Sequence, residues 1–416
     1  MSSERSDITR RRFLSTSIAG LAAAGLVGVG PRIASAEGAK ESDKAAGVSK
    51  PPKGGEGKMI YRDLGKTGIR LPIVSMGAMN AENPEIVKAS YEAGVRHFDT
   101  AASYAFGRNE QMLGKVFKDL GIRDKVVIGT KQIVFARQGL GAAEAKAKFI
   151  KLTEASLSRL QTEYVDIIYM HDARGVDGLE QEASFAAMED LKKAGKARAT
   201  GLSTHQGMAE TITAVTKRSL CDVVLTSFNV SMAGDTALLD ALKAAAAAGI
   251  GILAMKTQAG GRQLPNQDAL AKHESAIQHK AMLKWALRHE AVTTAIPGYT
   301  SYQHMTDLIY AGTGLDYTED EKRFLADGNL QVGLGFCRQC GSCLASCPRG
   351  ADVPTLMRTH MYAAQYANFA QARMTLGGIR PERGLRACAI CSTCMARCVN
   401  AVDIAYRIED LRLIYG

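Results

Sequence analysis

The chain has 416 residues, of which 46% are hydrophobic. This composition excludes a largely disordered protein, and the length allows a barrel of about 250 residues beside a smaller domain. The net charge of +10 is spread along the chain, with no basic stretch interleaved with aromatic residues, so we expect no binding of nucleic acid. Eight of the nine cysteines lie between Cys337 and Cys398, which assigns the thiol chemistry to the C-terminal part.

The first 36 residues have the pattern of an export signal. The segment Thr9-Arg10-Arg11-Arg12-Phe13-Leu14-Ser15 resembles the twin-arginine motif, and Ala34-Ser35-Ala36 offers a cleavage site of small residues. The apolar stretch between them, from Ile18 to Val29, is short for a membrane span. We therefore expect export to the periplasm or cell envelope. A basic disordered tail and an uncleaved membrane tether are the alternatives.

Residues 37–58 are rich in Lys, Gly, Ala and Pro, and we expect them to be a disordered linker.

From residue 59 to residue 330, short apolar runs alternate with amphipathic helical patterns. Eight such units predict an α/β fold, a closed (β/α)8 TIM barrel. Ile60–Leu64 and Ile69–Leu71 precede them and predict a hairpin that caps the bottom of the barrel. The expected strands are Ile73–Gly77, Arg96–Asp99, Val126–Thr130, Ile167–Met170, Ala199–Ser203, Val223–Thr226, Gly251–Ala254 and Thr294–Ile296.

Four polar residues follow the second, third and fourth expected strands: Asp99, Tyr104, Lys131 and His171. Catalytic groups of such barrels lie at the carboxyl ends of the strands, so we expect these four to meet at one mouth. A neighbouring lysine favours the phenolate, so we expect Lys131 to lower the pKa of Tyr104. An imidazole can polarise a substrate carbonyl while the tyrosine delivers a proton to its oxygen.

The strings HFDTAASY, VVIGTK and YVDIIYMHD resemble the aldo-keto reductase family. The resemblance implies that Asp99, Tyr104, Lys131 and His171 form the catalytic tetrad of that family. It also implies that the protein interconverts a carbonyl and an alcohol.

The family's nicotinamide site is matched only in part. The resemblance implies Ser203 and Asn229 as cofactor contacts, and Lys256 and Arg262 are further cations that could assist. Leu225 replaces the usual glutamine, and Gly298 and His304 replace the cations that bind the 2′-phosphate. Binding of NADP(H) is thus doubtful, although it stays open.

The C-terminal cysteines form two runs with the spacing C-x-x-C-x-x-C-x-x-x-C, which is the spacing of bacterial ferredoxins. We expect residues 331–416 to form a mainly α-helical ferredoxin-like domain that binds two [4Fe–4S] clusters, with a helix over Val353–Ala372. Zinc sites and disulfides are the alternatives. The lone Cys221 is expected to be a core residue. By analogy, one cluster takes Cys337, Cys340, Cys343 and Cys398, and the other takes Cys388, Cys391, Cys394 and Cys347.

The sequence thus predicts an exported iron–sulfur oxidoreductase of the aldo-keto reductase type. It would act on a small carbonyl or alcohol and exchange electrons with an unidentified partner, for which a membrane-associated protein is one candidate. The alternative is a non-catalytic electron carrier whose barrel is a docking scaffold for a redox partner of the cell envelope.

Overall fold

The computed structural model describes residues 58–134, 139–260, 269–327 and 335–416. The predicted export signal and all of the predicted linker except Lys58 lie outside these ranges. Within them, no helix has both the length and the apolar character needed to cross a membrane.

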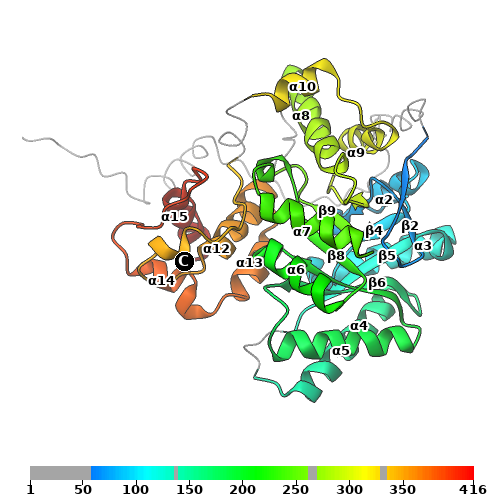
Figure 1. The fold of residues 1–416 in the computed structure, drawn as a ribbon, viewed down its shortest axis with the longest axis horizontal. Helices are drawn as coiled ribbons and strands as arrows, with labels where there is room; N and C mark the ends of the chain where they lie inside the picture. The colour runs from blue at the N-terminus through cyan, green and yellow to red at the C-terminus, as the bar shows by residue number, and fades with distance from the viewer. Residues whose placement is uncertain (1–57, 135–138, 261–268, 328–334) are drawn as a thin grey trace, which may run out of the picture. The chain divides into compact units, whose positions relative to one another are not determined.

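Eight parallel strands form one sheet in which each strand pairs with its neighbours in the sequence (Figure 1). The sheet closes where Val74 bridges Ala295, and the Ser75 amide donates to the Ala295 carbonyl at 2.8 Å. The predicted (β/α)8 barrel is therefore confirmed. Its strands are β3 (Met76–Gly77), β4 (His97–Asp99), β5 (Val127–Gln132), β6 (Val165–Ala173), β7 (Ala197–Thr204), β8 (Val223–Ser227), β9 (Gly251–Met255) and β10 (Thr294–Ala295).

A two-stranded antiparallel hairpin precedes the barrel, formed by β1 (Tyr61–Asp63) and β2 (Arg70–Pro72). Leu64 and Leu71 are fully buried in the same apolar cluster as inward-facing strand residues such as Leu225. The Lys66 amide donates to the carbonyl of Gly249, just before β9 begins. The hairpin therefore closes the amino end of the barrel, as the sequence predicts.

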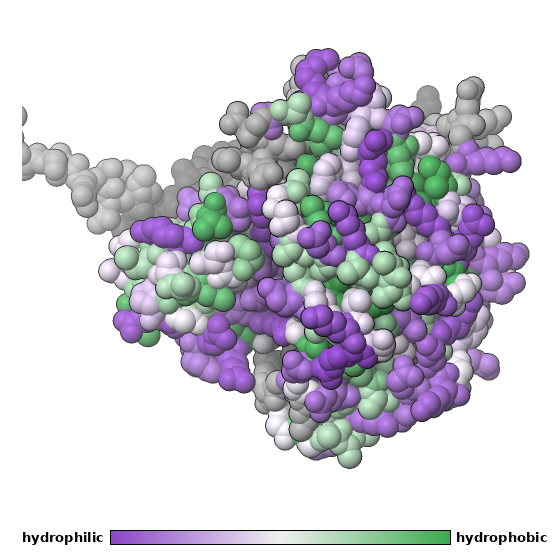
Figure 2. Space-filling model, viewed as in Figure 1, coloured by the Kyte–Doolittle hydropathy of each residue, from purple (hydrophilic) through white to green (hydrophobic). Residues whose placement is uncertain are grey.

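Helices surround the sheet because each carries one apolar face that packs on the strands. Gly114 lets two of them approach closely, since a Cβ atom there would lie 2.5 Å from the backbone of Leu160. Hydrophilic residues dominate their visible outer faces in Figure 2. The helices are α2 (Pro84–Glu92), α3 (Arg108–Leu120), α4 (Ala142–Leu160), α5 (Leu179–Lys193), α6 (Met208–Arg218), α7 (Thr236–Ala247), α8 (Ala269–Leu287), α9 (Tyr302–Tyr310) and α10 (Glu319–Leu325).

The C-terminal part is helical in the described range 335–416, as predicted. Its helices are α12 (Val353–His360), a π-helical turn η8 (Met361–Gln365), α13 (Phe369–Gly377), α14 (Leu385–Ala389) and α15 (Ile404–Tyr415). The single helix expected over 353–372 is wrong. Ala367 adopts a left-handed φ of 50°, and the Asn368 side chain accepts from the Gln371 amide, which starts a new helix.

Helix α12 links two apolar cores. Val353, Leu356 and Met357 are buried in a cluster with the cysteine-bearing loops. One turn later, Met361 and Tyr362 belong to the large core that contains the outer faces of the barrel strands. The segment α12–η8 is therefore anchored in both parts, which fixes its side chains against the barrel.

Candidate active site

The four predicted tetrad residues meet at the carboxyl ends of β4, β5 and β6. The Lys131 ammonium donates to an Asp99 carboxylate oxygen and to the Thr100 carbonyl, the latter at 2.6 Å. The same nitrogen lies 3.5 Å from the Tyr104 hydroxyl. The His171 ring stands edge-on to the Tyr104 ring, with centroids 5.9 Å apart.

Burial dominates the protonation of these groups. It raises the pKa of Tyr104 well above 10, and the negative charges of Asp99 and Asp172 add to the effect. The expectation that Lys131 lowers the pKa of Tyr104 is therefore wrong, because the Lys131 ammonium is paired with the Asp99 carboxylate. A tyrosine with a raised pKa stays protonated and can donate its hydroxyl proton.

His171 is neutral at physiological pH. Burial lowers its pKa to about 3, and the positive charges of Lys131, Arg358 and Lys256 contribute. A neutral imidazole offers one N–H donor and one acceptor to a substrate.

The C-terminal part contributes a tyrosine to this mouth. The Tyr362 hydroxyl accepts a hydrogen bond from Lys256 Nζ at 3.0 Å. The Tyr362 phenol is also close enough to influence the pKa values of Tyr104 and Lys131. Helix η8 therefore covers the end of the barrel at which the tetrad lies.

A buried ion pair fastens α12 to the same mouth. Arg358 Nη1 and Nη2 donate to the two carboxylate oxygens of Asp172 at 2.5 and 2.7 Å. Burial opposes ionisation of Asp172, but the charge and hydrogen bonds of Arg358 outweigh it and hold the pKa below its usual value. The side chain of Arg358 is only 5% exposed. An arginine this buried depends on its carboxylate partner.

Two of the predicted cofactor contacts support these links with the C-terminal part. Ser203 Oγ accepts from the Asp172 amide at 3.0 Å, and so helps to hold Asp172 in its left-handed conformation at φ 58°. Asn229 Nδ2 donates to the Lys256 carbonyl at 3.1 Å, and Lys256 also has a left-handed φ, of 57°. The side chains of Ser203 and Asn229 are thus engaged within the protein.

The described residues do not fit the 2′-phosphate of NADP(H) at its usual place. His304 is 7% exposed, stacks on His279 and is paired with Gln258, and burial lowers its pKa to about 3. An uncharged ring cannot supply the fixed positive charge that a phosphate needs. Gly298 has no side chain, and Leu225 is buried in the barrel core. Arg262, another candidate, lies outside the described residues.

The eight clustered cysteines fall into the two predicted sets. Cys337, Cys340, Cys343 and Cys398 line one cavity of about 330 Å³. In the other set, the Cys388 thiol has its pKa raised to about 11 by burial and by the nearby thiols of Cys347, Cys394 and Cys391. Each set draws three cysteines from one run and one from the other, which suits a cluster whose fourth ligand comes from the partner run.

All nine cysteines are free thiols, so the disulfide alternative finds no support. Cys221 is buried beside β8, as expected. Among the described residues, no three His, Cys, Asp or Glu side chains converge closely enough to bind one metal ion. A four-iron cluster distributes its ligands around a cube, and the cysteine sets fit that larger group. Gln339 Nε2 lies 3.2 Å from Cys337 Sγ and can donate to it, and hydrogen bonds of this kind tune the reduction potential of a cluster.

Comparisons with known proteins match both parts of the chain. The family described as "Aldo/keto reductase family" matches residues 74–282, about half of the chain. The protein belongs to the aldo/keto reductase family. The description "4Fe-4S dicluster domain" matches residues 336–403, which contain all eight clustered cysteines. The chain is therefore an aldo-keto-reductase-like oxidoreductase with an iron–sulfur domain.

Individual relatives match the barrel. Aldo-keto reductase YhdN of Bacillus subtilis (strain 168) is 31% identical over 157 residues, which cover 35% of this chain and 47% of YhdN. L-galactose dehydrogenase of Arabidopsis thaliana is 26% identical over 294 residues, covering 62% and 90%. The holo form of aldo-keto reductase AKR11C1 from Bacillus halodurans has a TM-score of 0.50 at 24% identity, covering 64% of this chain and 95% of that one, which supports the fold.

Sequence reasoning did not identify Asp172, Arg358 or Tyr362. The available signal was weak: an arginine in an otherwise apolar helical turn between the two cysteine runs, and an acid directly after the predicted His171. Asp172 and Arg358 are 186 positions apart in the sequence, and only the tertiary structure brings them together.

Arg358→Met should lower the free energy of unfolding by about 3 kcal/mol, because it leaves Asp172 as an unpaired buried charge. Chemical denaturation of the anaerobic holoprotein, followed by circular dichroism, measures this. Changing both partners, with Asp172→Asn added, should recover most of the loss, because asparagine is uncharged and tolerates the left-handed φ of this position. The exposed pair of Arg218 and Asp177 provides the control, and Arg218→Met should cost at most about 1 kcal/mol. Equal losses in Arg358→Met and Arg218→Met would contradict this account.

Pairs of cysteine variants should reveal how the cysteines are shared between the clusters. The double variant Cys398→Ala and Cys337→Ala should lose the iron and sulfide of one cluster. This loss should equal that of Cys398→Ala alone. Cys398→Ala combined with Cys391→Ala should lose those of both clusters. Iron and sulfide analysis of anaerobically purified protein measures this, with Cys221→Ala as the control that keeps both clusters. The reverse pattern would show that each run binds its own cluster.

Proposed function

We propose that this protein is an exported iron–sulfur oxidoreductase that interconverts a small carbonyl and an alcohol at the barrel mouth. The observation that carries the proposal is the convergence of Tyr104, His171 and the Lys131–Asp99 pair beneath the iron–sulfur domain. The name of the relative L-galactose dehydrogenase supports a substrate of this chemical class.

The roles of the side chains follow from their protonation. Tyr104 is protonated and donates its hydroxyl proton to the carbonyl oxygen in the direction of reduction. Lys131, held by Asp99, places positive charge beside that oxygen and stabilises the tyrosinate that forms. His171, as a neutral imidazole, orients the carbonyl with its N–H.

The eight cysteines would hold two [4Fe–4S] clusters, which supply single-electron transfer when bound. Reduction of a carbonyl to an alcohol consumes two electrons and two protons, whereas each cluster transfers one electron at a time. A two-electron carrier bound at the mouth would therefore have to collect two electrons from the domain and transfer a hydride to the carbonyl carbon while Tyr104 protonates the oxygen. Because the described residues do not fit the 2′-phosphate of NADP(H) at its usual place, we assign the supply of electrons to an unidentified redox partner that docks on the domain.

The covered mouth of the barrel also suits a second function, that of a non-catalytic electron carrier. Tyr104 is 9% exposed beneath the C-terminal helices, which also suits a barrel that is only a docking scaffold for an electron carrier. The Lys131–Asp99 pair argues against that alternative, since a buried ion pair with no catalytic use stabilises a fold poorly.

Tyr104→Phe distinguishes the two functions. It should lower the reduction of glyceraldehyde by dithionite-reduced methyl viologen about a hundredfold or more, because it removes the proton donor. Reduction of the clusters, followed by their visible absorbance, should be unchanged. Tyr61→Phe, in the hairpin at the opposite end of the barrel, is the control. Equal turnover in Tyr104→Phe and the parent protein would favour the carrier.

We propose export by the twin-arginine pathway on the strength of residues 9–36, which the described ranges do not include. This pathway carries folded proteins, so it suits a chain whose clusters are inserted before export. The expected destination is the periplasm or the cell envelope.

Replacing both Arg10 and Arg11 with lysine should retain the protein in the cytoplasm. Fractionation of cells followed by immunoblotting measures this, with Lys40→Arg in the predicted linker as the control. Unchanged export of the double variant would contradict the proposed pathway.

A further inference from the structure

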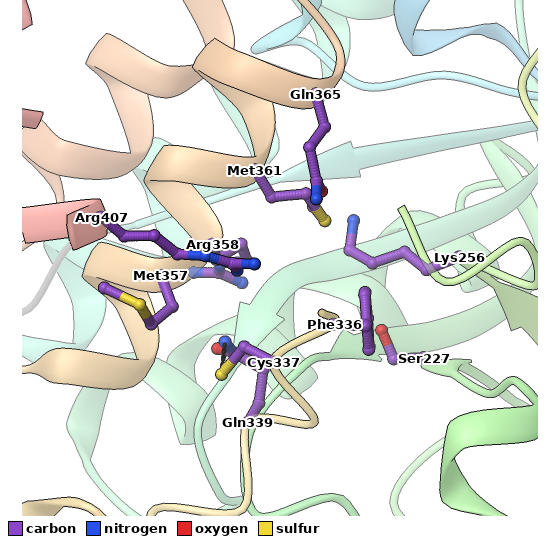
Figure 3. A pocket seen from close by; sticks show the side chains of 10 residues that line it. All are labelled: Ser227, Lys256, Phe336, Cys337, Gln339, Met357, Arg358, Met361, Gln365 and Arg407. Carbon is purple, nitrogen blue, oxygen red and sulfur yellow. Dashed lines mark hydrogen bonds between the residues drawn. The ribbon is translucent and has the colours of Figure 1, made fainter. Parts of the chain in front are cut away.

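A cavity of about 290 Å³ lies where the ends of β8 and β9 meet the C-terminal part (Figure 3). Ser227 and Lys256 line it from the barrel. The iron–sulfur domain supplies the rest of the wall, with Phe336, Cys337, Gln339, Met357, Arg358, Met361, Gln365 and Arg407.

Three lining residues have buried polar atoms without a hydrogen-bond partner in the structure. They are Ser227 Oγ, Gln339 Oε1 and Arg358 Nε. Each of these residues is at most 5% exposed. Buried polar atoms are normally satisfied, and three unsatisfied ones around one cavity indicate a missing partner. Arg358 Nε–H can only donate, Gln339 Oε1 can only accept, and the serine hydroxyl can do either.

The charge around this cavity is positive. In Figure 3, Arg358 and Arg407 extend toward it from one side and Lys256 from the other. Arg358 is paired with Asp172, and Arg407 lies near Asp403 and the Cys337 thiol. Within the described ranges, no carboxylate forms an ion pair with Lys256, whose side chain donates to the Tyr362 hydroxyl. Lys256 is therefore the cation available to an incoming anion.

The backbone holds two of these residues in strained positions. Lys256 and Gln339 have left-handed φ angles of 57° and 59°, although neither is glycine. Such conformations are strained for residues other than glycine and persist where the surrounding structure requires them, often at binding sites. Asn229 fixes the first through the Lys256 carbonyl. Two residues that line the cavity are thus held by the fold in backbone conformations that residues other than glycine disfavour.

We propose that this cavity binds a small organic anion, a carboxylate or a phosphate ester that also carries a hydroxyl or carbonyl group. Lys256 binds the anionic group, Arg358 Nε–H and Ser227 donate to its oxygens, and Gln339 Oε1 accepts from a ligand hydroxyl. If this anion is the substrate of the enzyme, the substrate class is that of small hydroxy and oxo acids or phosphorylated sugars. This assignment of the substrate rests on the proposed function.

The cavity also adjoins the predicted cluster site. Cys337 lines both this cavity and the one shared by Cys340, Cys343 and Cys398. A ligand that contacts Lys256 would lie close to the sulfur that binds the first cluster. Its binding should therefore alter the spectrum of that cluster, a readout that does not depend on turnover.

The test is isothermal titration of the anaerobic holoprotein with lactate and with its neutral analogue lactamide. Glycerol 3-phosphate and glycerol form the second pair, which distinguishes a phosphate from a carboxylate ligand. At least one anion should bind about tenfold or more tightly than its neutral analogue, since a charged hydrogen bond is worth at least this factor. Lys256→Met should remove the difference, and Lys256→Arg should keep it. Lys217→Met, at the carboxyl end of α6, should have no effect.

The electron paramagnetic resonance spectrum of the reduced protein supplies the second measurement. The anion that binds should change the cluster signal, and Lys256→Met should abolish that change. Absence of binding by both anions at millimolar concentration would overturn the proposal and leave a cavity filled only by water. Equal affinity for charged and neutral probes would overturn it as well. Binding that depends on Lys256 without turnover of any carbonyl would keep this site and refute the proposed function instead.

Discussion

The ion pair between Asp172 and Arg358 is the contact on which the arrangement of this molecule depends. It joins a residue at the end of β6 to a helix between the two cysteine runs, and it is nearly closed to solvent. Burying a guanidinium is costly unless a carboxylate meets it with good geometry, so this pair tolerates few alternative placements of α12. Once α12 is fixed, Tyr362 in the next turn meets Lys256, and the mouth of the barrel is covered.

The residues that resemble the nicotinamide site of the family have a structural use in this chain. Ser203 and Asn229 position the backbones of Asp172 and Lys256, whose side chains contact α12 and η8. The place where a 2′-phosphate would lie contains a buried and uncharged His304. The barrel end that would accept a dinucleotide therefore faces an iron–sulfur domain. The proposed exchange of electrons through the clusters accords with this arrangement.

The same arrangement creates a low-dielectric mouth in which charges act strongly on one another. Burial keeps Tyr104 protonated and His171 neutral, and Lys131 and Asp99 are paired with each other inside the protein. The proposed role of Tyr104 as a proton donor depends on its protonated state. The covering helices contribute to this state because they exclude water from the mouth.

The sequence by itself determined the elements and the chemistry of the individual residues. Alternating apolar runs and helical patterns predicted eight strands in a barrel, and the spacing of the cysteines predicted an iron–sulfur domain, because both signals are local. The order of Asp99, Tyr104, Lys131 and His171 on successive strands predicted that they would meet, since strand ends converge in this fold. The break at Ala367 was missed because no glycine or proline marks it. Only the tertiary structure decided the electrostatics, since the raised pKa of Tyr104 results from burial beneath residues distant in the sequence. The pairing of Asp172 with Arg358 and the cavity beside Lys256 also depend on how two separately predictable parts pack together, and neither segment carries that information alone.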